Sequence, residues 1–407
     1  MLIFLSYLIL IFGFIINENI TTGAKDWPHI SRIILKFTEN FQNYFPLYEN
    51  RHSPVLYIIL SIFKKAGLNF DIIRFLHLHI NLITLVFAYK CIQIRYPNLK
   101  KIFILFISLS IILLSPNLRT AGYWSLPYSL GFLFLVIFFY FTLKYSQKLK
   151  KNNDEIKYLI LSILFLILSS YISPNFCLFG IYFIYIFFKK KNKKKITFPI
   201  LFFTIFILAL PGLYYFFIYN PFFIFNIGVS SQINDSTRFN VFNKIAIIST
   251  IIFFHLTPFL LKIPFNNILR NPNLKLKIIL LLLIYFVTLL NFNFTPEFGG
   301  GGFFYKLSYI LTNNDYLFFV IFFISLVFIF LIIDKSLNNF ILILIFILMN
   351  PQLSIYHRYY DPLILLTFLL FFEKSIFKKE IIDKNMTYII FFYILFFNIS
   401  YVARNYI

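Results

Sequence analysis

Apolar runs separated by short polar segments make up most of the chain. A helix that crosses a membrane needs about 20 apolar residues, and thirteen runs come near that length. The pattern therefore predicts an all-α polytopic membrane protein with about 13 transmembrane helices. The predicted spans are 2–16, 72–93, 102–115, 126–144, 158–172, 175–188, 197–218, 244–262, 278–292, 316–333, 338–350, 361–372 and 386–403.

One apolar stretch, 54–63 (PVLYIILSIF), is too short to cross a bilayer. It predicts an interfacial or re-entrant helix instead. Thirteen spans leave only about 10 residues for each connection, so the sequence predicts a single integral-membrane domain over 1–407, without a separate soluble domain.

The longest predicted external segment is 17–71, and it contains a second helical pattern. Asp26 precedes Trp27 and Pro28, which predicts a helix that Asp26 caps and that has Pro28 in its first turn. Apolar residues then recur at helical spacing, which predicts an amphipathic helix lying on the membrane. The recurring apolar residues are Ile30, Ile33, Ile34 and Phe37.

The composition excludes a soluble globular protein. Hydrophobic residues make up 60% of the chain, aromatic residues 22% and charged residues only 13%, whereas a soluble domain carries about 25% charged residues. Cys91 and Cys177 both lie inside apolar runs, which predicts neither a disulfide framework nor a metal site.

The net charge of +22 is unevenly distributed over the predicted topology. With a cytoplasmic N-terminus, the cytoplasmic loops hold 24 basic and six acidic residues and the external side holds 13 basic and nine acidic residues. This is the positive-inside pattern of membrane proteins. The run KKKNKKK at 189–195 is then a topological anchor whose partner is anionic lipid, and nucleic acid is not indicated.

The order of several motifs resembles the GT-C superfamily of glycosyltransferases that use polyprenyl-phosphate sugars. The branch it looks most like contains the protein mannosyltransferases and lipid A aminoarabinose transferases. The resemblance covers the whole chain and depends on the order of the motifs. The matching features are Asp26, SPVLYIILSIF at 53–63, GLNFDIIRFLHL at 67–78, LLSPNLRTAGYWSLPYSLGFLF at 113–134, ILSSYISPNFCLFGIYFIYIFF at 167–188 and IYHRYYDPLILL at 355–366.

The resemblance implies an inverting transfer from a polyprenyl-phosphate sugar to a glycan, lipid or protein acceptor. It also implies an enzyme of the bacterial inner membrane with its active site on the external, periplasmic side. In this reading Asp26 is the base that takes the proton of the acceptor. The alternative for Asp26 is a helix cap and nothing more.

Several basic residues of the external segments are candidates for binding the phosphate of the donor. Arg358, beside His357 and Tyr359, lies on the side that the positive-inside rule disfavours, and a lipid phosphate would match its guanidinium. The alternatives for Arg358 are pairing with a carboxylate or a headgroup. Arg51 and His52 precede Pro54 and are candidates to contact phosphate or acceptor, or to anchor the segment at the interface.

Further candidates have weaker patterns. His29 lies three residues from Asp26 and could share its site on a helix, although no obligatory metal and no cofactor is predicted. Arg119 with Tyr123 and Trp124 could bind a sugar ring or belong to an interfacial aromatic belt. His77 and His79 are expected to hydrogen-bond between helices.

The segment around four consecutive glycines, Gly299–Gly302, is the other loop with candidate chemistry. Together with Glu297 and Lys306 it could close over a substrate as a hinge, or it could be a flexible solvent loop. Glu297 and Lys306 are therefore candidate substrate-binding residues.

Two further function classes compete with the transferase. A transporter or lipid flippase should carry ionisable residues at the membrane midplane and broken helices in two related halves. No such repeat is evident, and nearly every charge lies at the end of a span. A polymerase or ligase of lipid-linked glycans is the second alternative, but there the long external loop is expected late in the chain.

Overall fold

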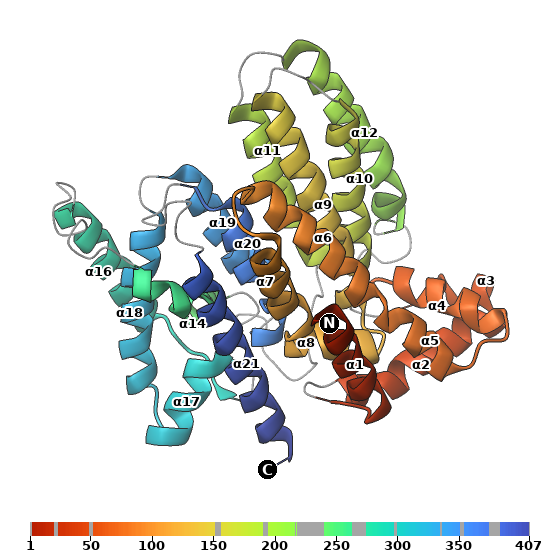
Figure 1. Cartoon of the computed structure of the whole chain (residues 1–407), viewed down its shortest axis with the longest axis horizontal. Coiled ribbons are helices and arrows are strands. Elements are labelled where there is room, and N and C mark those ends of the chain that lie inside the picture. The colour runs from red at the N-terminus through yellow and green to blue at the C-terminus, as the bar shows by residue number, and fades with distance from the viewer. Residues whose placement is uncertain are drawn as a thin grey trace. The chain divides into compact units, whose positions relative to one another are not determined.

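The computed structural model is built of helices (Figure 1). No strand occurs among the residues it describes, and the one isolated bridge joins Gly300 to Ile355. The structure describes residues 2–19, 23–48, 52–150, 156–189, 194–215, 217, 240–262, 274–296, 299–333, 336–350, 354–373 and 383–406.

The chain divides into two compact units, and the long helix α21 (Lys384–Tyr406) has residues in both. The first unit comprises 1–227 and 391–407. Its helices are α1 (Leu2–Ile15), α2 (Gly23–Glu39), α3 (Phe41–Tyr44), α4 (Val55–Lys65), α5 (Phe70–Leu78), α6 (Ile80–Arg95), α7 (Lys101–Leu113), α8 (Pro116–Tyr123), α9 (Pro127–Lys150), α10 (Ile156–Ile172), η1 (Pro174–Leu178), α11 (Phe179–Lys189) and α12 (Lys194–Tyr214).

The second unit comprises 228–390, and its core is formed around α14. Helices α16, α17, α18, α19 and α20 all contact α14. The bounds of its helices are α14 (Val241–Leu256), η5 (Thr257–Lys262), α16 (Leu274–Leu290), α17 (Gly302–Thr312), α18 (Tyr316–Ile333), α19 (Leu337–Leu348), η7 (His357–Tyr359) and α20 (Leu363–Phe371).

Among the residues that the structure describes, three helical stretches are long and apolar enough to cross a membrane: Phe70–Arg95, Pro127–Lys148 and Val241–Leu261. Helices α7 and α8 make a fourth span only if the pair, bent by 61° between them, counts as one. The other apolar helical segments within the described ranges have 10–17 residues, and some are parts of longer helices, such as α12 with 21 residues and α21 with 23. The described part of the chain is thus helical with three candidate membrane-spanning helices, which is consistent with an α-helical membrane protein, and it does not show the thirteen spans that the sequence predicts.

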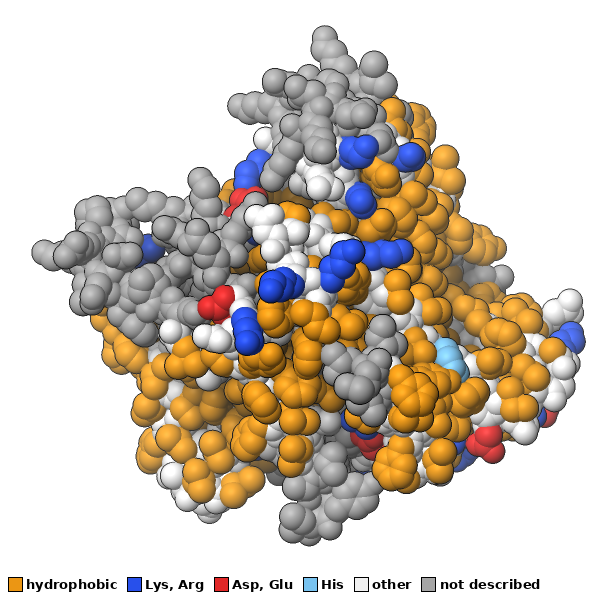
Figure 2. Space-filling view, in the orientation of Figure 1, with side chains coloured by type: hydrophobic (Ala, Val, Ile, Leu, Met, Phe, Trp, Pro, Cys, Tyr) orange, Lys and Arg blue, Asp and Glu red, His pale blue; other side chains and the backbone are white. Residues whose placement is uncertain are grey.

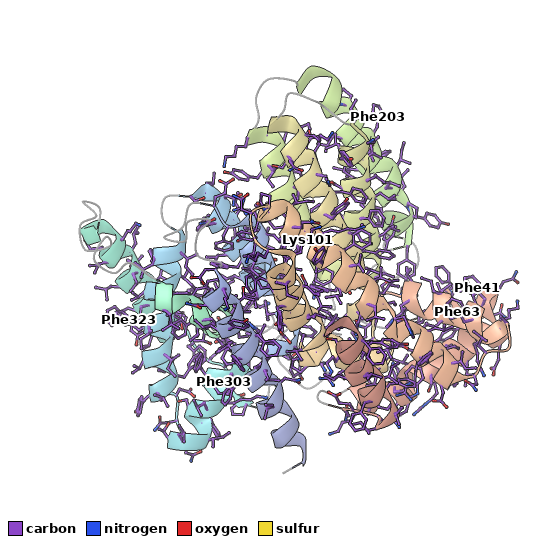
Figure 3. All side chains as sticks on the ribbon, in the orientation of Figure 1. Phe41, Phe63, Lys101, Phe203, Phe303 and Phe323 are labelled. Atoms are coloured by element: carbon purple, nitrogen blue, oxygen red, sulfur yellow. The ribbon has the colours of Figure 1, made fainter. Side chains whose placement is uncertain are left out.

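Apolar side chains also cover much of the surface. Figure 2 shows hydrophobic side chains over most of the described surface on the visible face. Phe41, Phe63 and Phe203 are among the exposed aromatic side chains of the first unit (Figure 3). Lipid would cover such a surface, because the side chains that would make it soluble in water are scarce.

The amphipathic helix predicted after Asp26 is present as α2, but its apolar face does not lie on the membrane. Ile30, Ile33, Ile34 and Phe37 are buried in a core that α2 shares with α4 and with Tyr48. The short helix predicted over 54–63 is α4, which supplies Leu56, Tyr57 and Leu60 to this core. Two short amphipathic helices therefore bury their apolar faces against each other.

Cysteine labelling of the purified protein in detergent tests this packing. In a Cys177→Ser background, the Ile34→Cys thiol should stay unreactive toward a maleimide, because Ile34 is 0% exposed. The Leu47→Cys thiol should react readily, since Leu47 is 72% exposed. Equal labelling of the two positions in the folded protein would show that the apolar face of α2 is not buried.

Candidate functional site

The C-terminal end of α1 places an acidic residue, Glu18, in a fixed position. Asn17 has a left-handed backbone conformation with φ of 50°. The Glu18 amide donates to the Gly13 carbonyl at 2.8 Å and the Asn17 amide to the Phe14 carbonyl at 3.0 Å. This pair of hydrogen bonds is the Schellman motif, with Asn in the position where Gly is commonest. The helix end therefore fixes the backbone of Glu18.

A short helix, α8, presents the basic partner of Glu18. Ser115 caps α8, accepting a hydrogen bond from the Leu118 amide at 3.2 Å, and Pro116 occupies the first turn. Both residue types are favoured at these positions of a helix. One turn further on, Arg119 is only 6% exposed. The local sequence SPNLR thus starts a helix that buries an arginine.

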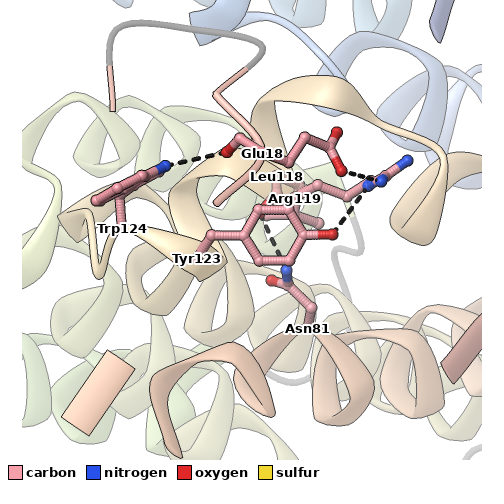
Figure 4. A network of polar contacts seen from close by, with 6 residues as sticks. All are labelled: Glu18, Asn81, Leu118, Arg119, Tyr123 and Trp124. Carbon is pink, nitrogen blue, oxygen red and sulfur yellow. Dashed lines mark hydrogen bonds and ion pairs between the residues drawn. The ribbon is translucent and has the colours of Figure 1, made fainter. Parts of the chain in front are cut away.

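Glu18 and Arg119 form a buried ion pair (Figure 4). Arg119 donates through Nη2 to Oε2 of Glu18 and through Nε to the Tyr123 hydroxyl at 3.2 Å. The indole of Trp124 donates to the Glu18 carbonyl at 3.0 Å. These four residues, together with Arg74, are called the Glu18 site below.

Burial determines the electrostatics of the Glu18 site. Glu18 is 3% exposed, and its Oε1 atom has no hydrogen-bond partner among the residues that the structure describes. Desolvation raises the pKa of the Glu18 carboxyl above its ordinary value, while the Arg119 charge and the hydrogen bonds from Arg119 and Tyr123 act in the opposite direction. The site thus offers a carboxylate with one oxygen held and the other oxygen available to a donor.

A second buried arginine, Arg74 of α5, connects α1 to α8. It donates through Nε to the Tyr123 carbonyl and through Nη2 to Oδ1 of Asn17, both at 2.9 Å. Its guanidinium carbon lies 3.9 Å from the centre of the Trp124 ring and 5.6 Å from that of Trp27. Arg74 therefore holds the Asn17 turn against α8 and stacks on both tryptophans.

Replacing Arg74 by lysine is expected to loosen the Glu18 site without removing the charge. An ammonium group cannot donate in two directions from one plane or stack on an indole as a guanidinium does. Loss of the stacking alone should cost about 0.5–2 kcal/mol. Unfolding monitored by tryptophan fluorescence measures this cost, and the emission of Trp124 should also shift. An unchanged spectrum would mean that Arg74 does not stack on Trp124.

The predicted hydrogen bonds of the two histidines between helices are confirmed. His77 of α5 hydrogen-bonds through Nδ1 to the Gly122 carbonyl at 3.2 Å and through Nε2 to the Ser129 hydroxyl at 3.3 Å. Nε2 of His79 lies 3.2 Å from the Tyr7 hydroxyl of α1. These bonds join α5 to α8, α9 and α1 around the Glu18 site.

Asp26 and His29 both lie on α2, as predicted, but Asp26 does not cap the helix. The helix begins at Gly23, so Asp26 lies in its first turn, where a carboxylate still interacts favourably with the helix dipole. Asp26 is half-buried and His29 is exposed. Trp27, between them, packs near Trp124 with ring centres 6.5 Å apart, so the first turn of α2 borders the Glu18 site.

The structure separates the other candidates of the first unit. Arg51 lies outside the described residues. His52 is half-buried, and its carbonyl accepts a hydrogen bond from the Tyr48 hydroxyl at 2.9 Å. Arg119 pairs with Glu18, and its neighbours Tyr123 and Trp124 are themselves buried. The two aromatic rings that could bind a sugar are thus packed inside the protein.

In the second unit, the candidates His357, Arg358 and Tyr359 form the short helix η7. The guanidinium carbon of Arg358 lies 4.7 Å from the Tyr356 ring centre and 5.4 Å from that of Tyr359. His357 is buried, with its ring centre 4.7 Å from that of His255. Burial, together with His255 and Lys306, holds the pKa of His357 well below its ordinary value, so its imidazole is neutral at pH 7.

The glycine segment joins this cluster through its backbone. The Gly301 amide donates to the Ile355 carbonyl at 2.9 Å, and Gly299 to Gly302 all have positive φ. Lys306 of α17 is half-buried and electrostatically coupled to His357. Within the second unit, then, Lys306 and the residues of η7 come together as candidates, whereas Glu297 lies outside the described residues.

Sequence reasoning missed Glu18 and Arg74. Glu18 is the first acidic residue after the first apolar run, so its position could have singled it out. The resemblance to the GT-C superfamily favours Asp26 instead, while the residues after Asp26 predict only a helix start. Nothing local in the sequence pairs Glu18 with Arg119, which lies 101 positions away.

The described residues contain no group of three or more His, Cys, Asp or Glu side chains that could hold a metal ion. No family model, curated protein or solved structure matches the chain.

Proposed function

We propose that the chain is a membrane glycosyltransferase that moves a sugar from a polyprenyl-phosphate donor to an acceptor. The acceptor is a glycan, a lipid or a protein on the external side of a bacterial inner membrane. The proposal includes thirteen membrane crossings, with the shorter apolar helices as crossings too, and a cytoplasmic N-terminus. The proposal is based on the order of motifs by which the chain resembles the GT-C superfamily.

The observation that best supports this proposal is the Glu18 site. A buried carboxylate paired with a buried arginine lies where α1 ends and the proposed external segment begins. Transfer of a sugar to a hydroxyl or amine needs a group that accepts a proton, and loss of the polyprenyl phosphate needs cations. Carboxylate and cation occur together here, whereas a helix that only spans a membrane needs neither.

Two predicted substrate-binding cations lie in the second unit. Arg358 and Lys306 are cations near the polypeptide between α19 and α20, which the proposed topology places on the external side. Guanidinium and ammonium groups are common ligands of phosphate in proteins. We propose that these two residues bind a phosphate group of a substrate.

Incubation of the purified protein with labelled polyprenyl phosphosugars tests the proposal. Each donor is presented in detergent or nanodiscs with a mixed membrane extract as the source of acceptor. The expected result is consumption of one donor, with release of polyprenyl phosphate in equal amount. Movement of an intact lipid-linked sugar across a vesicle membrane without its consumption would favour the flippase alternative.

A further inference from the structure

We propose that Glu18, rather than Asp26, is the carboxylate that takes the proton of the acceptor. This inference is based on the transferase activity proposed above and assigns a catalytic residue within it. It places the reacting carboxylate at the C-terminal end of α1 instead of in the first turn of α2.

Hydrogen bonds hold both the backbone and the side chain of Glu18 in place. Its amide is bonded to Gly13, its carbonyl to Trp124 and its Oε2 atom to Arg119. These contacts come from α1, from the end of α8 and from within α8. A catalytic group must keep its position to within a fraction of an ångström, and contacts on three sides of Glu18 provide this.

The second carboxylate oxygen of Glu18, Oε1, points to a missing hydrogen-bond donor. Oε1 of Glu18 is buried and makes no hydrogen bond within the described part of the chain. A buried acceptor atom without a donor costs about 1–3 kcal/mol, and more when it is charged. A hydroxyl or amine entering the site would supply the missing donor. The unpaired oxygen therefore indicates where a substrate with an O–H or N–H group binds.

Further buried polar atoms without a partner among the described residues occur in and just after α8, the helix that carries Arg119. The Thr120 hydroxyl on α8 and the Ser125 hydroxyl after it are also buried without a partner among the described residues. Ser125, which follows Trp124, has a φ of 47°. Backbone conformations of this kind are concentrated at functional sites.

The proposed step balances as follows. The acceptor oxygen or nitrogen forms a bond to the anomeric carbon of the sugar while its proton passes to Oε1 of Glu18. The bond from the anomeric carbon to the phosphate oxygen breaks, and polyprenyl phosphate leaves with the electron pair. Arg119 stays paired to Oε2 and keeps Oε1 aimed at the acceptor, so Arg119 acts as a positioning residue.

Asp26 is less suited to this role in the structure. It lies on a helix of which the neighbouring positions, Lys25 and His29, are exposed, and it is itself only half-buried. Water that reaches a carboxylate must be displaced before an acceptor can approach it. The partly exposed first turn of α2 is better explained as the border of the site.

The decisive experiment compares three carboxylate-to-amide variants in the donor-consumption assay. Glu18→Gln should lower kcat by about 10²–10⁴-fold, which is the usual contribution of a general base, while KM for the donor changes little. Glu39→Gln is the matched control, since Glu39 is an exposed acid at the far end of α2, and it should leave turnover unchanged. Asp26→Asn should reduce turnover less than Glu18→Gln does.

Glu18→Asp distinguishes a loss of catalysis from a failure to fold. It keeps the negative charge that pairs with Arg119 but shortens the side chain by one methylene. It should fold, as measured by tryptophan fluorescence, and still lose most of its turnover. Full turnover in folded Glu18→Gln or Glu18→Asp would overturn the assignment, as would a larger loss in Asp26→Asn. If the unmodified protein is active, these outcomes concern Glu18 alone; if it consumes none of the donors, the transferase proposal and this inference both fail.

Discussion

Replacing Arg119 by methionine is expected to lower the free energy of unfolding by about 3–5 kcal/mol. Methionine fills a similar volume but leaves the Glu18 carboxylate buried without its counter-charge. Breaking a buried ion pair from one side costs this much because an uncompensated charge remains in a medium of low polarity. Thermal or denaturant unfolding in detergent would measure the loss.

A double-mutant cycle separates the ion pair from the rest of the site. Glu18→Gln combined with Arg119→Met removes both charges, and the combined loss should be smaller than the sum of the two single losses. The chain contains two tryptophans: Trp124 belongs to the Glu18 site, and Trp27 lies against Arg74 of that site. Their fluorescence reports directly on whether this part of the protein is folded. Additive losses would mean that Glu18 and Arg119 do not interact.

Local patterns in the sequence were sufficient to predict helices α2 and α4 but not which surfaces they cover. The spacing of Ile30, Ile33, Ile34 and Phe37 predicts a helix with one apolar face, and α2 has that face. Membrane and protein are both apolar surroundings, so the pattern alone cannot distinguish lipid from the neighbouring helix α4. The partner of the face becomes visible only in the structure.

Hydropathy likewise predicts where apolar runs lie but not where the helices within them break. The apolar runs at 72–93, 126–144 and 244–262 correspond to the three stretches long enough to cross a membrane. The run at 102–115 ends where Ser115 and Pro116 begin a new helix at 61° to the first. Hydropathy averages over this break, whereas the cap and the proline define it.

The candidate site depends on contacts between distant parts of the sequence. Arg119 was a candidate from its position beside two aromatic residues, but its partner lies 101 positions earlier. Asn17 and Glu18 follow the first apolar run directly, and the Schellman geometry of Asn17 is consistent with its residue type. What the sequence cannot supply is the packing of α1 against α8, which turns a helix end into a buried carboxylate.

Gly13→Ala tests that packing, since a methyl group there would fall on the Tyr123 hydroxyl and on Oε2 of Glu18. Ala for Gly inside a helix is otherwise favourable by up to about 1 kcal/mol. Here the methyl group must displace Tyr123 or the ion pair, and overpacking of this kind costs about 1–3 kcal/mol. We therefore expect Gly13→Ala to lower the unfolding temperature and to change the tryptophan emission.

Gly180→Ala in α11 is the matched control. A methyl group at that position meets only Cδ2 of Leu166, at an ordinary contact distance of 3.5 Å. This variant should be as stable as the original protein or more stable, because only the helix propensity changes. The two substitutions are chemically identical and both lie in apolar helices, so opposite signs of their effects isolate the contact between α1 and Tyr123. If Gly13→Ala stabilised the protein as Gly180→Ala does, α1 could not pack against α8 as closely as the Glu18 site requires.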